Sequence, residues 1–377
     1  FCLSRGLGDV YKRQIPHSVL IAGGGTGGHI IPGLAVARAL QELGVENIAF
    51  LGTQRGLEST LVPAAGFPLH LIRIGGLKNL GLRAKFRTSV ALPGAVVQSH
   101  RVLKQCAAEV VLGIGGYVSG PALLAACWQT PVVVLETNAK TGLANRLARS
   151  WVRVAAVNFP ETAKDFRHAV ITGVPVREEF FDIPAARHEG LPTVLAFGGS
   201  QGARILNDTL PEVARLWQQQ EWHFRLIHQT GSGNVEAVRA RYQACGVEGV
   251  EVSAFLEEMP AAMAAADLVV CRSGASTLGE LAAARRAALL IPLPGAADQH
   301  QLRNARAYEA VGAAAVLEQA AATPVRLAET VQRLLRAPQK LRAMEAAVRP
   351  FARPKAAVSI ARLVIAASHL RRHERFH

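Results

Sequence analysis

The chain has 377 residues, half of them hydrophobic and 6% aromatic, with 42 basic against 28 acidic side chains and a formal charge of +14. This length predicts two domains, or at most three, each large enough to bury its own core. The composition excludes a disordered or fibrous chain and favours parallel sheets that helices cover on both faces. Charge alone does not rank nucleic acid, an anionic membrane or phosphorylated small molecules as partners. The basic residues lack the interleaved aromatics of single-strand binding, so we expect no nucleic acid.

The first predicted strand follows residues 1–14, which show no hydrophobic period and which we interpret as a tail or an artefact outside the fold. The apolar run 19–22 leads into a glycine-rich turn, Gly23-Gly24-Gly25-Thr26-Gly27-Gly28-His29, that opens a helix. Glycine lets the backbone turn sharply and lets a charged ligand approach the free N–H groups, where the helix dipole favours phosphate by roughly 0.3–1 kcal/mol. The turn therefore predicts a nucleotide site.

This turn also matches a dinucleotide fingerprint, Gly-x-Gly-x-x-Gly. That fingerprint expects an acidic residue at the end of the next strand, where the chain has Phe50-Leu51-Gly52-Thr53, and a Walker A loop would need Lys-Ser or Lys-Thr at His29-Ile30. His29 stands in the first turn of the helix, where the dipole disfavours imidazolium and favours a ring that accepts a proton. His29 is a candidate general base, with packing or capping as the alternative.

Strands and helices alternate along the rest of the first half. Apolar runs predict strands at 48–51, 110–114 and 132–135, and Gly115-Gly116-Tyr117-Val118-Ser119-Gly120-Pro121 forms another glycine-rich turn. This alternation is typical of right-handed βαβ units and a parallel sheet, whose ligands bind beyond the carboxyl ends of the strands. The pattern relaxes near 173–177, and the charged, proline-bearing stretch 177–192 predicts a linker.

The second half repeats the pattern, with strands predicted at 193–197, 224–228, 250–252, 268–271 and 288–291. The first of them leads into a second glycine-rich turn, Gly198-Gly199-Ser200-Gln201-Gly202-Ala203. A last helix, over about 356–370, has one apolar face that could pack back on the first domain. Two nucleotide-type domains that face one cleft are therefore expected.

Two polar segments of the second half are further candidates. Cys271-Arg272-Ser273-Gly274-Ala275-Ser276-Thr277 opens a helix whose small and hydroxyl residues can donate to phosphate, and Glu280 can accept from a ribose diol. A plain N-cap with Glu280 as its box partner is the alternative. Asp298-Gln299-His300-Gln301 follows a strand and a proline-rich loop, which favours ligand contact over a solvated loop.

The sequence lacks two common metal-binding spacings. The five cysteines are widely spaced without a CxxC pair, which indicates reduced thiols rather than a zinc site or disulfides. The six aspartates include no Asp-x-Asp pair of the kind that clamps a nucleotide diphosphate through a divalent ion. We expect neither a metal nor a cofactor, so in a sugar transfer helix ends and neutral donors would stabilise the leaving charge.

Six short sequence motifs follow one another in a fixed order between about residues 15 and 310. They are Gly24-Gly25-Thr26-Gly27-Gly28-His29 with Pro32-Gly33-Leu34-Ala35, Gly115 to Pro121, Gly142-Leu143-Ala144-Asn145-Arg146, Gly198 to Ala203, Cys271 to Ala275, and Asp298 to Gln301 with Asn304-Ala305. The set resembles the MurG family, transferases that move N-acetylglucosamine from UDP onto the lipid-linked muramyl-pentapeptide of bacterial cell-wall synthesis.

The resemblance implies an α/β fold of the GT-B type, two Rossmann-like domains with parallel sheets facing a central cleft. Residues 15–173 would form the N-terminal acceptor-binding and membrane-facing domain, and residues 174–350 the C-terminal domain that binds UDP-N-acetylglucosamine. Residues 351–377 would form a helix that returns to the first domain. Transfer to the C4 hydroxyl of N-acetylmuramic acid would invert the anomeric centre in one displacement, without a metal.

Site residues carry over by position. The resemblance makes His29 the base that takes the proton from the acceptor hydroxyl, and it brings Thr26, Gly27, Gly28 and Asn138 to the donor from the first domain. In the second domain, uracil, ribose and diphosphate would bind Arg177, Ser200, Leu256, Ala275, Ser276, Thr277, Leu278, Gly279, Glu280 and Gln301.

The resemblance also implies partners and a place in the cell. The partners are UDP-N-acetylglucosamine, the lipid-linked MurNAc-pentapeptide acceptor, an anionic membrane surface, and proteins of cell-wall synthesis and division. The enzyme would be peripheral at the cytoplasmic face of the bacterial inner membrane. One segment is suited to that surface because it interleaves apolar and basic residues, namely Leu77, Leu80, Leu82 and Phe86 with Lys78, Arg83, Lys85 and Arg87. Each cation would add up to ~1 kcal/mol to binding at an anionic bilayer. A solvated amphipathic segment is the alternative.

The chain departs from the family pattern at several positions. Leu135-Glu136-Thr137-Asn138 stands where His-Glu-Gln-Asn is common, Lys140-Thr141 and Val174 are unusual, and Arg285-Arg286-Ala287 replaces Gly-Leu-Pro. Two other functions therefore stay open at this point: a UDP-sugar epimerase or another GT-B transferase, and a divergent homologue that binds the nucleotide sugar without turnover.

Overall fold

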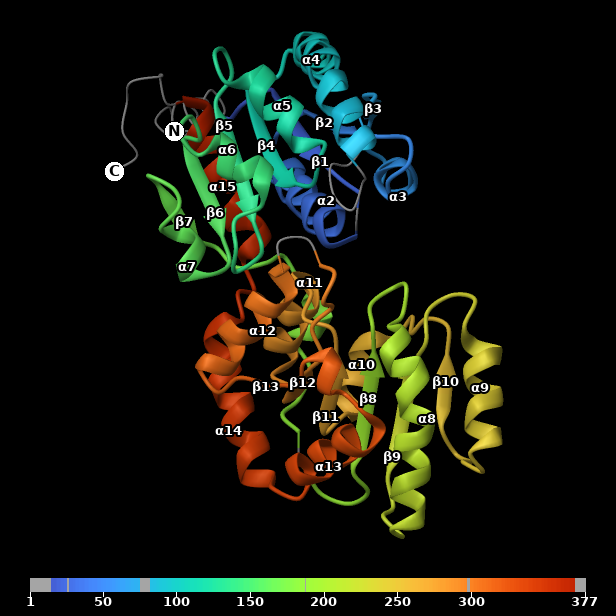
Figure 1. The fold of residues 1–377 in the computed structure, drawn as a ribbon. Helices are drawn as coiled ribbons and strands as arrows, with labels where there is room; N and C mark the ends of the chain where they lie inside the picture. Colours follow the sequence, from blue (N-terminus) through green and yellow to red (C-terminus); the bar gives the residue numbers. More distant parts are fainter. Residues whose placement is uncertain (1–14, 26, 75–81, 187, 297–298, 370–377) are drawn as a thin grey trace, which may run out of the picture. The chain divides into compact units, whose positions relative to one another are not determined.

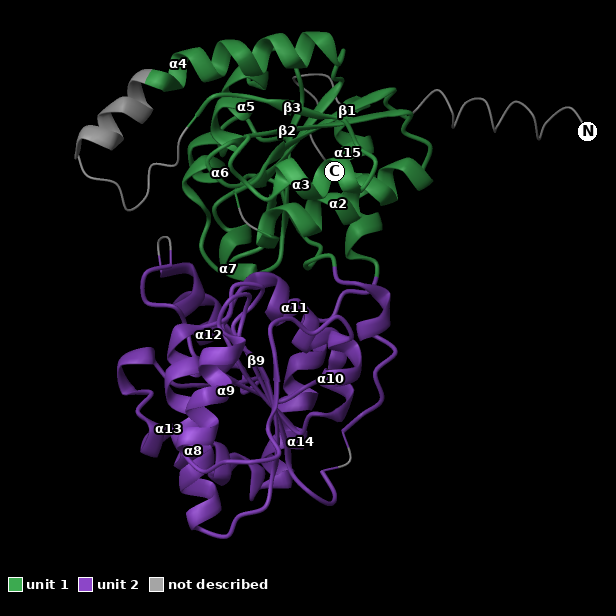
Figure 2. Ribbon diagram, turned by 90° about the vertical axis from the view of Figure 1, so that its right-hand side faces the viewer, with its two compact units in different colours: residues 1–175, 355–377 green, residues 176–354 purple. Residues whose placement is uncertain are grey.

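The computed structural model describes residues 15–25, 27–74, 82–186, 188–296 and 299–369, and for residues 82–90 it describes the helix without its side chains. The chain divides into two compact units (Figure 2). The N-terminal unit combines residues 1–175 with 355–377, and the C-terminal unit comprises residues 176–354.

The N-terminal unit is built on a seven-stranded sheet in the order β3-β2-β1-β4-β5-β6-β7 among the described residues (Figure 1). All of its strand pairs are parallel. The strands are β1 (Ser18–Gly23), β2 (Asn47–Gly52), β3 (Leu69–Leu71), β4 (Val110–Gly115), β5 (Val132–Glu136), β6 (Val154–Val157) and β7 (Ala169–Ile171). The helices are α2 (Gly27–Glu42), α3 (Glu58–Ala64), α4 (Leu82–Gln105), α5 (Ser119–Ala126), α6 (Leu143–Ala148), α7 (Pro160–Ala163) and α15 (Ala356–His369).

Strand β1 is buried along its whole length because helices cover both faces of the sheet. Successive side chains of a strand point to opposite faces. Val19 and Ile21 therefore join one core with α2 and α15, whereas Leu20 and Ala22 join another with α4 and α5. Because helices cover both faces of the sheet, residues 19–22 of β1 are all apolar and do not alternate with polar residues.

The last described helix, α15, belongs to the N-terminal unit. It lies beside α2 (Figure 2) and also contacts strands β4, β5 and β6. Ile360, Ala361 and Val364 are fully buried in the same core as Val19. The apolar face of α15 thus completes one layer of a unit whose first strand lies more than 300 positions earlier in the chain.

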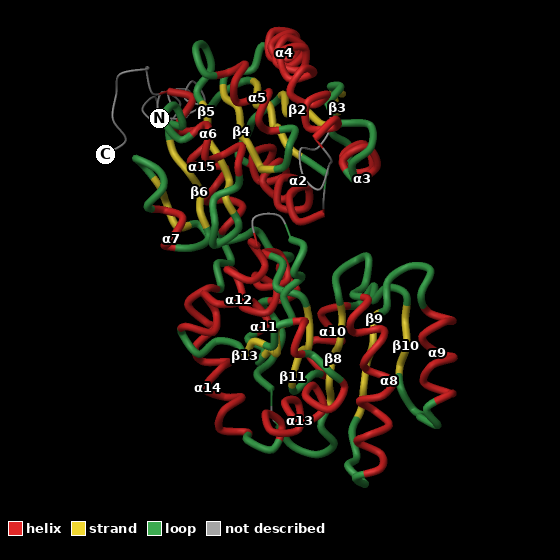
Figure 3. Tube along the Cα trace, viewed as in Figure 1, coloured by secondary structure: helices red, strands yellow, loops and turns green. Residues whose placement is uncertain are grey.

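The C-terminal unit holds a parallel sheet of six strands in its described part, in the order β10-β9-β8-β11-β12-β13. Strands and helices alternate along the chain (Figure 3). The strands are β8 (Thr193–Phe197), β9 (Arg225–Gln229), β10 (Glu251–Ser253), β11 (Leu268–Cys271), β12 (Ala288–Leu290) and β13 (Ala315–Val316). The helices are α8 (Arg204–Gln219), α9 (Val235–Ala244), α10 (Met259–Ala265), α11 (Ala275–Ala284), α12 (His300–Ala310), α13 (Pro324–Leu335) and α14 (Pro338–Val348), with 3₁₀ turns η1 (Glu178–Phe180), η3 (Gln319–Ala321) and η4 (Arg349–Phe351).

Both sheets are doubly wound. The strand order reverses between β1 and β4 in one unit and between β8 and β11 in the other, and such switch points are where open α/β sheets bind ligands. The predicted α/β class with two Rossmann-like domains is confirmed. The strands predicted from apolar runs are present within one residue of their expected positions at 193–197, 224–228, 250–252 and 268–271.

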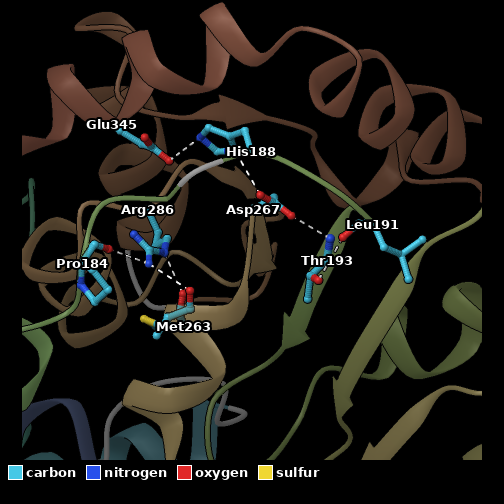
Figure 4. Close-up of polar contacts among 9 residues, drawn as sticks. Pro184, His188, Leu191, Thr193, Met263, Asp267, Arg286 and Glu345 are labelled. Carbon is cyan, nitrogen blue, oxygen red and sulfur yellow. Dashed lines mark hydrogen bonds and ion pairs between the residues drawn. The ribbon is translucent and has the colours of Figure 1, made fainter.

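The stretch 177–192, predicted as a linker, packs onto the C-terminal unit instead. Phe180 and Ile183 are buried there, and the guanidinium of Arg286, itself fully buried, donates to the carbonyl oxygens of Pro184 and Met263 (Figure 4). Prolines and charges suggested an exposed connection, but two apolar side chains and one buried cation hold the segment in place.

The same stretch carries a buried histidine. The ring nitrogens of His188 lie 3.2 Å from a carboxylate oxygen of Asp267 and 2.9 Å from one of Glu345, and Asp267 also accepts the N–H of Thr193 at 2.8 Å (Figure 4). Thr193 begins β8 and Asp267 precedes β11. The cluster therefore lies at the amino ends of the strands, at the opposite edge from the switch-point loops.

The segment proposed for membrane contact falls largely outside the description. Leu77, Lys78 and Leu80 lie outside the described residues, and so do the side chains of Leu82, Arg83, Lys85, Phe86 and Arg87. Within the part of the chain that is described, no helix combines the length and apolar character needed to cross a bilayer.

Candidate functional site

Two glycine turns meet at the carboxyl edge of the N-terminal sheet. Gly23 and Gly115 are partners in the register of β1 and β4, with a shift between Ala22 and Gly23. A β-carbon on Gly116 would lie 2.3 Å from the carbonyl oxygen of Gly24, and one on Gly23 would lie 2.6 Å from that of Gly115. Backbone packs on backbone here, so both turns need glycine.

His29 lies beside this junction, in the first turn of α2. Its half-buried ring packs on Gly115, where a β-carbon would come within 2.8 Å of the ring atoms Cε1 and Nδ1. The absence of a side chain at Gly115 therefore leaves the space that the imidazole ring occupies.

A buried carboxylate organises the loop after β5. Glu136 accepts the backbone N–H groups of Asn138 at 3.2 Å and Gly142 at 2.8 Å, together with the side-chain amides of Asn138 and Asn145. Burial raises the pKa of Glu136, and these hydrogen bonds oppose that shift. Leu135 and Thr137 depart from the family pattern, but Glu136 and Asn138 keep it, and their hydrogen bonds still hold the loop together.

In the C-terminal unit, the loop between β11 and α11 is fastened from two sides. The hydroxyl of Ser273 donates to the carbonyl oxygen of Gln301 at 2.8 Å, and the amide of Asn304 donates to the carbonyl oxygen of Ser273 at 3.1 Å. The half-buried Gln301 also accepts the N–H of Leu293 at 3.0 Å. Helix α12 therefore holds the start of α11 in position.

The first turn of α11 is suited to an anion. Its N-cap, Gly274, provides no side-chain hydrogen bond to the helix, and the hydroxyl oxygen of Ser276 is buried without a partner among the described residues. Buried hydroxyls are normally hydrogen-bonded, so this one is available to a ligand. A phosphate at this helix end could accept from it.

Glu280 lies one turn further along α11. Burial raises its pKa from 4.5 to about 7, and the nearby charge of Arg177 partly opposes that shift. The guanidinium carbon of Arg177 lies 5.1 Å from the centre of the Phe180 ring. The residues around 177 and α11 are therefore brought together, as the resemblance implies for a nucleotide site.

The other predicted residues are more dispersed. Gly27 and Gly28 begin α2, whereas Thr26 and Asp298 lie outside the described residues. Ser200 is exposed after β8, and Leu256 is half-buried after β10. The side chain of Leu278 is fully buried on the inner face of α11, with Ala275 and Gly279 also buried. In the part of the chain that is described, no three His, Cys, Asp or Glu side chains gather as metal ligands.

Sequence reasoning missed one acidic residue beside the first glycine turn. The dinucleotide fingerprint directed attention to the end of β2, where Thr53 stands, but the acid lies five positions later at Glu58. The carboxylate of Glu58 accepts the N–H of Gly25 at 2.8 Å. The signal available in the sequence was the pair of glycines, Gly52 and Gly56, that leaves room for this side chain.

Family models match most of the chain. Residues 19–157 match the glycosyltransferase family 28 N-terminal domain, and residues 193–361 match the glycosyltransferase family 28 C-terminal domain. A relative from Solibacter usitatus is 45% identical over 343 residues, which cover 90% of this chain and 93% of the relative. That relative is named UDP-N-acetylglucosamine--N-acetylmuramyl-(pentapeptide) pyrophosphoryl-undecaprenol N-acetylglucosamine transferase.

Comparison with solved structures supports the same family and the same fold. The crystal structure of MurG from Acinetobacter baumannii has a TM-score of 0.76 and 33% identity, covering 93% of this chain and 99% of that one. The UDP-GlcNAc 2-epimerase of Neisseria meningitidis, crystallised with UDP-GlcNAc, has a TM-score of 0.63 at 15% identity over 93% of this chain, a likeness that shows the fold alone. The resemblance carried by the six sequence stretches is confirmed, and the chain belongs to the MurG family of glycosyltransferases, with its GT-B fold.

Proposed function

We propose that this chain transfers N-acetylglucosamine from UDP-N-acetylglucosamine to the C4 hydroxyl of the N-acetylmuramic acid in undecaprenyl-pyrophosphoryl-MurNAc-pentapeptide. The observation that carries the proposal is the 45% identity, over 90% of the chain, to a relative named for that transfer. Each unit offers one part of the required chemistry: an imidazole on the N-terminal unit and a helix end suited to an anion on the C-terminal unit.

His29 is the proposed general base. As the acceptor oxygen attacks the anomeric carbon, the bond from that carbon to the diphosphate oxygen breaks and the hydroxyl proton passes to the imidazole. Attack opposite the leaving group inverts the anomeric centre. Gly115 holds the ring, and the dipole of α2 keeps it ready to accept the proton. General-base catalysis of this kind contributes ~10²–10⁴ in rate.

Helix α11 is the proposed site of the leaving diphosphate. Its uncapped N–H groups and the hydroxyl of Ser276 can donate to phosphate oxygens as negative charge develops there. Glu280 can accept from the ribose hydroxyls one turn further along. In this scheme Gln301 positions the loop at Ser273, and Arg177 lies beside Glu280.

The test is an acceptor-dependent assay. Incubation with radiolabelled UDP-N-acetylglucosamine and a short-chain lipid acceptor analogue should give a labelled disaccharide lipid and one UDP per transfer, and His29→Ala should lower the rate ~10²–10⁴-fold. Formation of a 2-epimer without acceptor would indicate an epimerase instead. Nucleotide-sugar binding without turnover would indicate a non-catalytic homologue.

We also propose that the enzyme is peripheral at the cytoplasmic face of the inner membrane, because its acceptor carries a polyprenyl chain. The interleaved cations and apolar residues of 77–87 support this. Changing Lys78, Arg83, Lys85 and Arg87 to Gln should lower co-sedimentation with anionic vesicles, and unchanged binding would contradict the proposed surface.

A further inference from the structure

A buried carboxylate lies directly behind the first glycine turn. Glu58, the first residue of α3, is fully buried, and its oxygens accept the N–H of Gly25 at 2.8 Å and the N–H of Thr53 at 3.0 Å. We infer that Glu58 is a positioning residue, which fixes the turn that carries the proposed base His29. The inference rests on the proposed transferase function for its catalytic consequence.

The hydrogen bonds around Glu58 run in one direction. The hydroxyl of Thr53 donates to Glu58 at 2.9 Å, and the phenol oxygen of Tyr117 lies 3.0 Å from the same Thr53 oxygen. Because Thr53 has one hydroxyl hydrogen and gives it to the carboxylate, its lone pair accepts from the phenol. A chain from Tyr117 through Thr53 therefore ends on Glu58.

Three glycines make the space for this carboxylate. A β-carbon would lie 2.4 Å from the Glu58 carboxyl carbon if placed on Gly24, 2.0 Å from a carboxylate oxygen if placed on Gly56, and 2.5 Å from Cγ if placed on Gly52. Gly24 belongs to the turn, Gly52 ends β2 and Gly56 precedes α3. The glycines of three separate segments thus accommodate one acidic side chain.

Glu58 is connected to both turns that lie beside the His29 ring, the one after β1 and the one after β4. Gly25 lies two residues before α2, and a β-carbon on Gly25 would lie 3.1 Å from the ring of Tyr117. Tyr117 follows Gly115, on which the imidazole packs. The carboxylate therefore fixes the β1 turn directly and the β4 turn through Thr53 and Tyr117.

The test compares Glu58→Gln with Glu109→Gln. A glutamine amide offers one acceptor oxygen, so its NH₂ group must face the N–H of either Gly25 or Thr53. That N–H group then loses its hydrogen-bond acceptor. Glu109 is exposed and likewise accepts a backbone N–H, that of His17 at 2.9 Å, but at the amino edge of the same sheet. It is therefore a matched control.

The expected result separates turnover from donor affinity. Glu58→Gln should lower kcat about tenfold to a hundredfold by displacing the base, while KM for UDP-N-acetylglucosamine changes less than about threefold because most of the proposed donor contacts lie on the other unit. Glu109→Gln should match the unchanged protein in both constants. Equal kinetics for the two variants would overturn the inference, as would a loss of kcat that equals the loss of folded protein in urea titrations.

A second readout does not depend on activity. Hydrogen exchange of the peptide that spans 19–30 should be faster in Glu58→Gln than in Glu109→Gln, with peptides of the C-terminal unit unchanged. Thr53→Val should show part of this increase, and Thr53→Ser, which keeps the hydroxyl, should restore protection. If the unchanged protein transfers no sugar, the proposed function fails, whereas equal exchange in the two glutamine variants overturns the role of Glu58 alone.

Discussion

The ring of His29 occupies the space that a side chain on Gly115 would need, since a β-carbon there would come within 2.8 Å of two ring atoms. Gly115 also has φ of +93°, which an L side chain rarely adopts. Gly115→Ala should displace the imidazole and lower kcat roughly 100-fold. Gly94→Ala, where the added carbon meets no atom within 4 Å, is the matched control, and similar steady-state kinetics for the two variants would contradict the packing described here.

Ser276→Ala should have opposite effects on ligand binding and on folding. Its hydroxyl is buried without a partner among the described residues, so its removal should leave the unfolding free energy unchanged or slightly higher. If the hydroxyl donates to a phosphate oxygen, the Kd for UDP measured by calorimetry should rise about tenfold or more. Ser368→Ala on α15, whose hydroxyl donates to Ile365, serves as control. An unchanged Kd would exclude Ser276 from the site.

Glu280 predicts a pH dependence of nucleotide binding. Its pKa of about 7 means that the carboxylate is mostly protonated at pH 6 and mostly ionised at pH 8. If the ionised form accepts from the ribose hydroxyls, the affinity for UDP should rise about tenfold between these pH values, and Glu280→Gln should remove the rise. Calorimetry at both pH values decides the matter, and an equal rise in the variant would assign it to another group.

The same group affects stability with the opposite sign. Because the folded chain holds the Glu280 proton more tightly than an ordinary carboxyl of pKa 4.5, its stabilising contribution is present below pH 4.5 and is lost as the pH rises through about 7. The free energy of unfolding of the unchanged protein should therefore fall, relative to that of Glu280→Gln, as the pH rises from 5 to 8. Parallel urea titrations would show it, and a constant difference would contradict the assigned pKa.

Arg286→Leu should destabilise the C-terminal unit by about 3 kcal/mol or more, because each buried carbonyl oxygen left without its donor costs about 1–3 kcal/mol. The guanidinium is fully buried and satisfies four backbone carbonyl oxygens, those of Pro184, Met263, Ala264 and Ala284. Arg204→Leu is the control, because its side chain is 95% exposed and its ion pair contributes at most about 1 kcal/mol. Equal urea midpoints for the two variants would show that the four carbonyl contacts contribute little.

The fold could be predicted because its signals are local. Apolar runs such as 110–114 and 193–197 mark strands that are buried on both faces, and glycine-rich turns mark the strand-to-helix junctions at which ligands bind. The position of His29 in the first turn of α2 follows from the same local pattern.

What the sequence left hidden depends on contacts between distant segments. The bond from Gly25 to Glu58 joins residues 33 positions apart, and Arg286 reaches Pro184 across 102 positions. No periodicity or motif encodes such pairs, so the stretch 177–192 resembled a linker and the acid behind the glycine turn was not identified. The inner position of Leu278 on α11 likewise becomes visible only when the helix packs.

The return of α15 to the N-terminal unit has a consequence for biosynthesis. Ile360, Ala361, Val364 and Ala367 fill a core whose other buried members lie before residue 176, whereas residues 176–354 form their unit from one continuous segment. During synthesis on the ribosome, all residues of the C-terminal unit are therefore available before the N-terminal unit has received α15. Until α15 emerges, an apolar surface beside α2 stays open to water and to chaperones, and premature termination before α15 would leave that surface permanently uncovered.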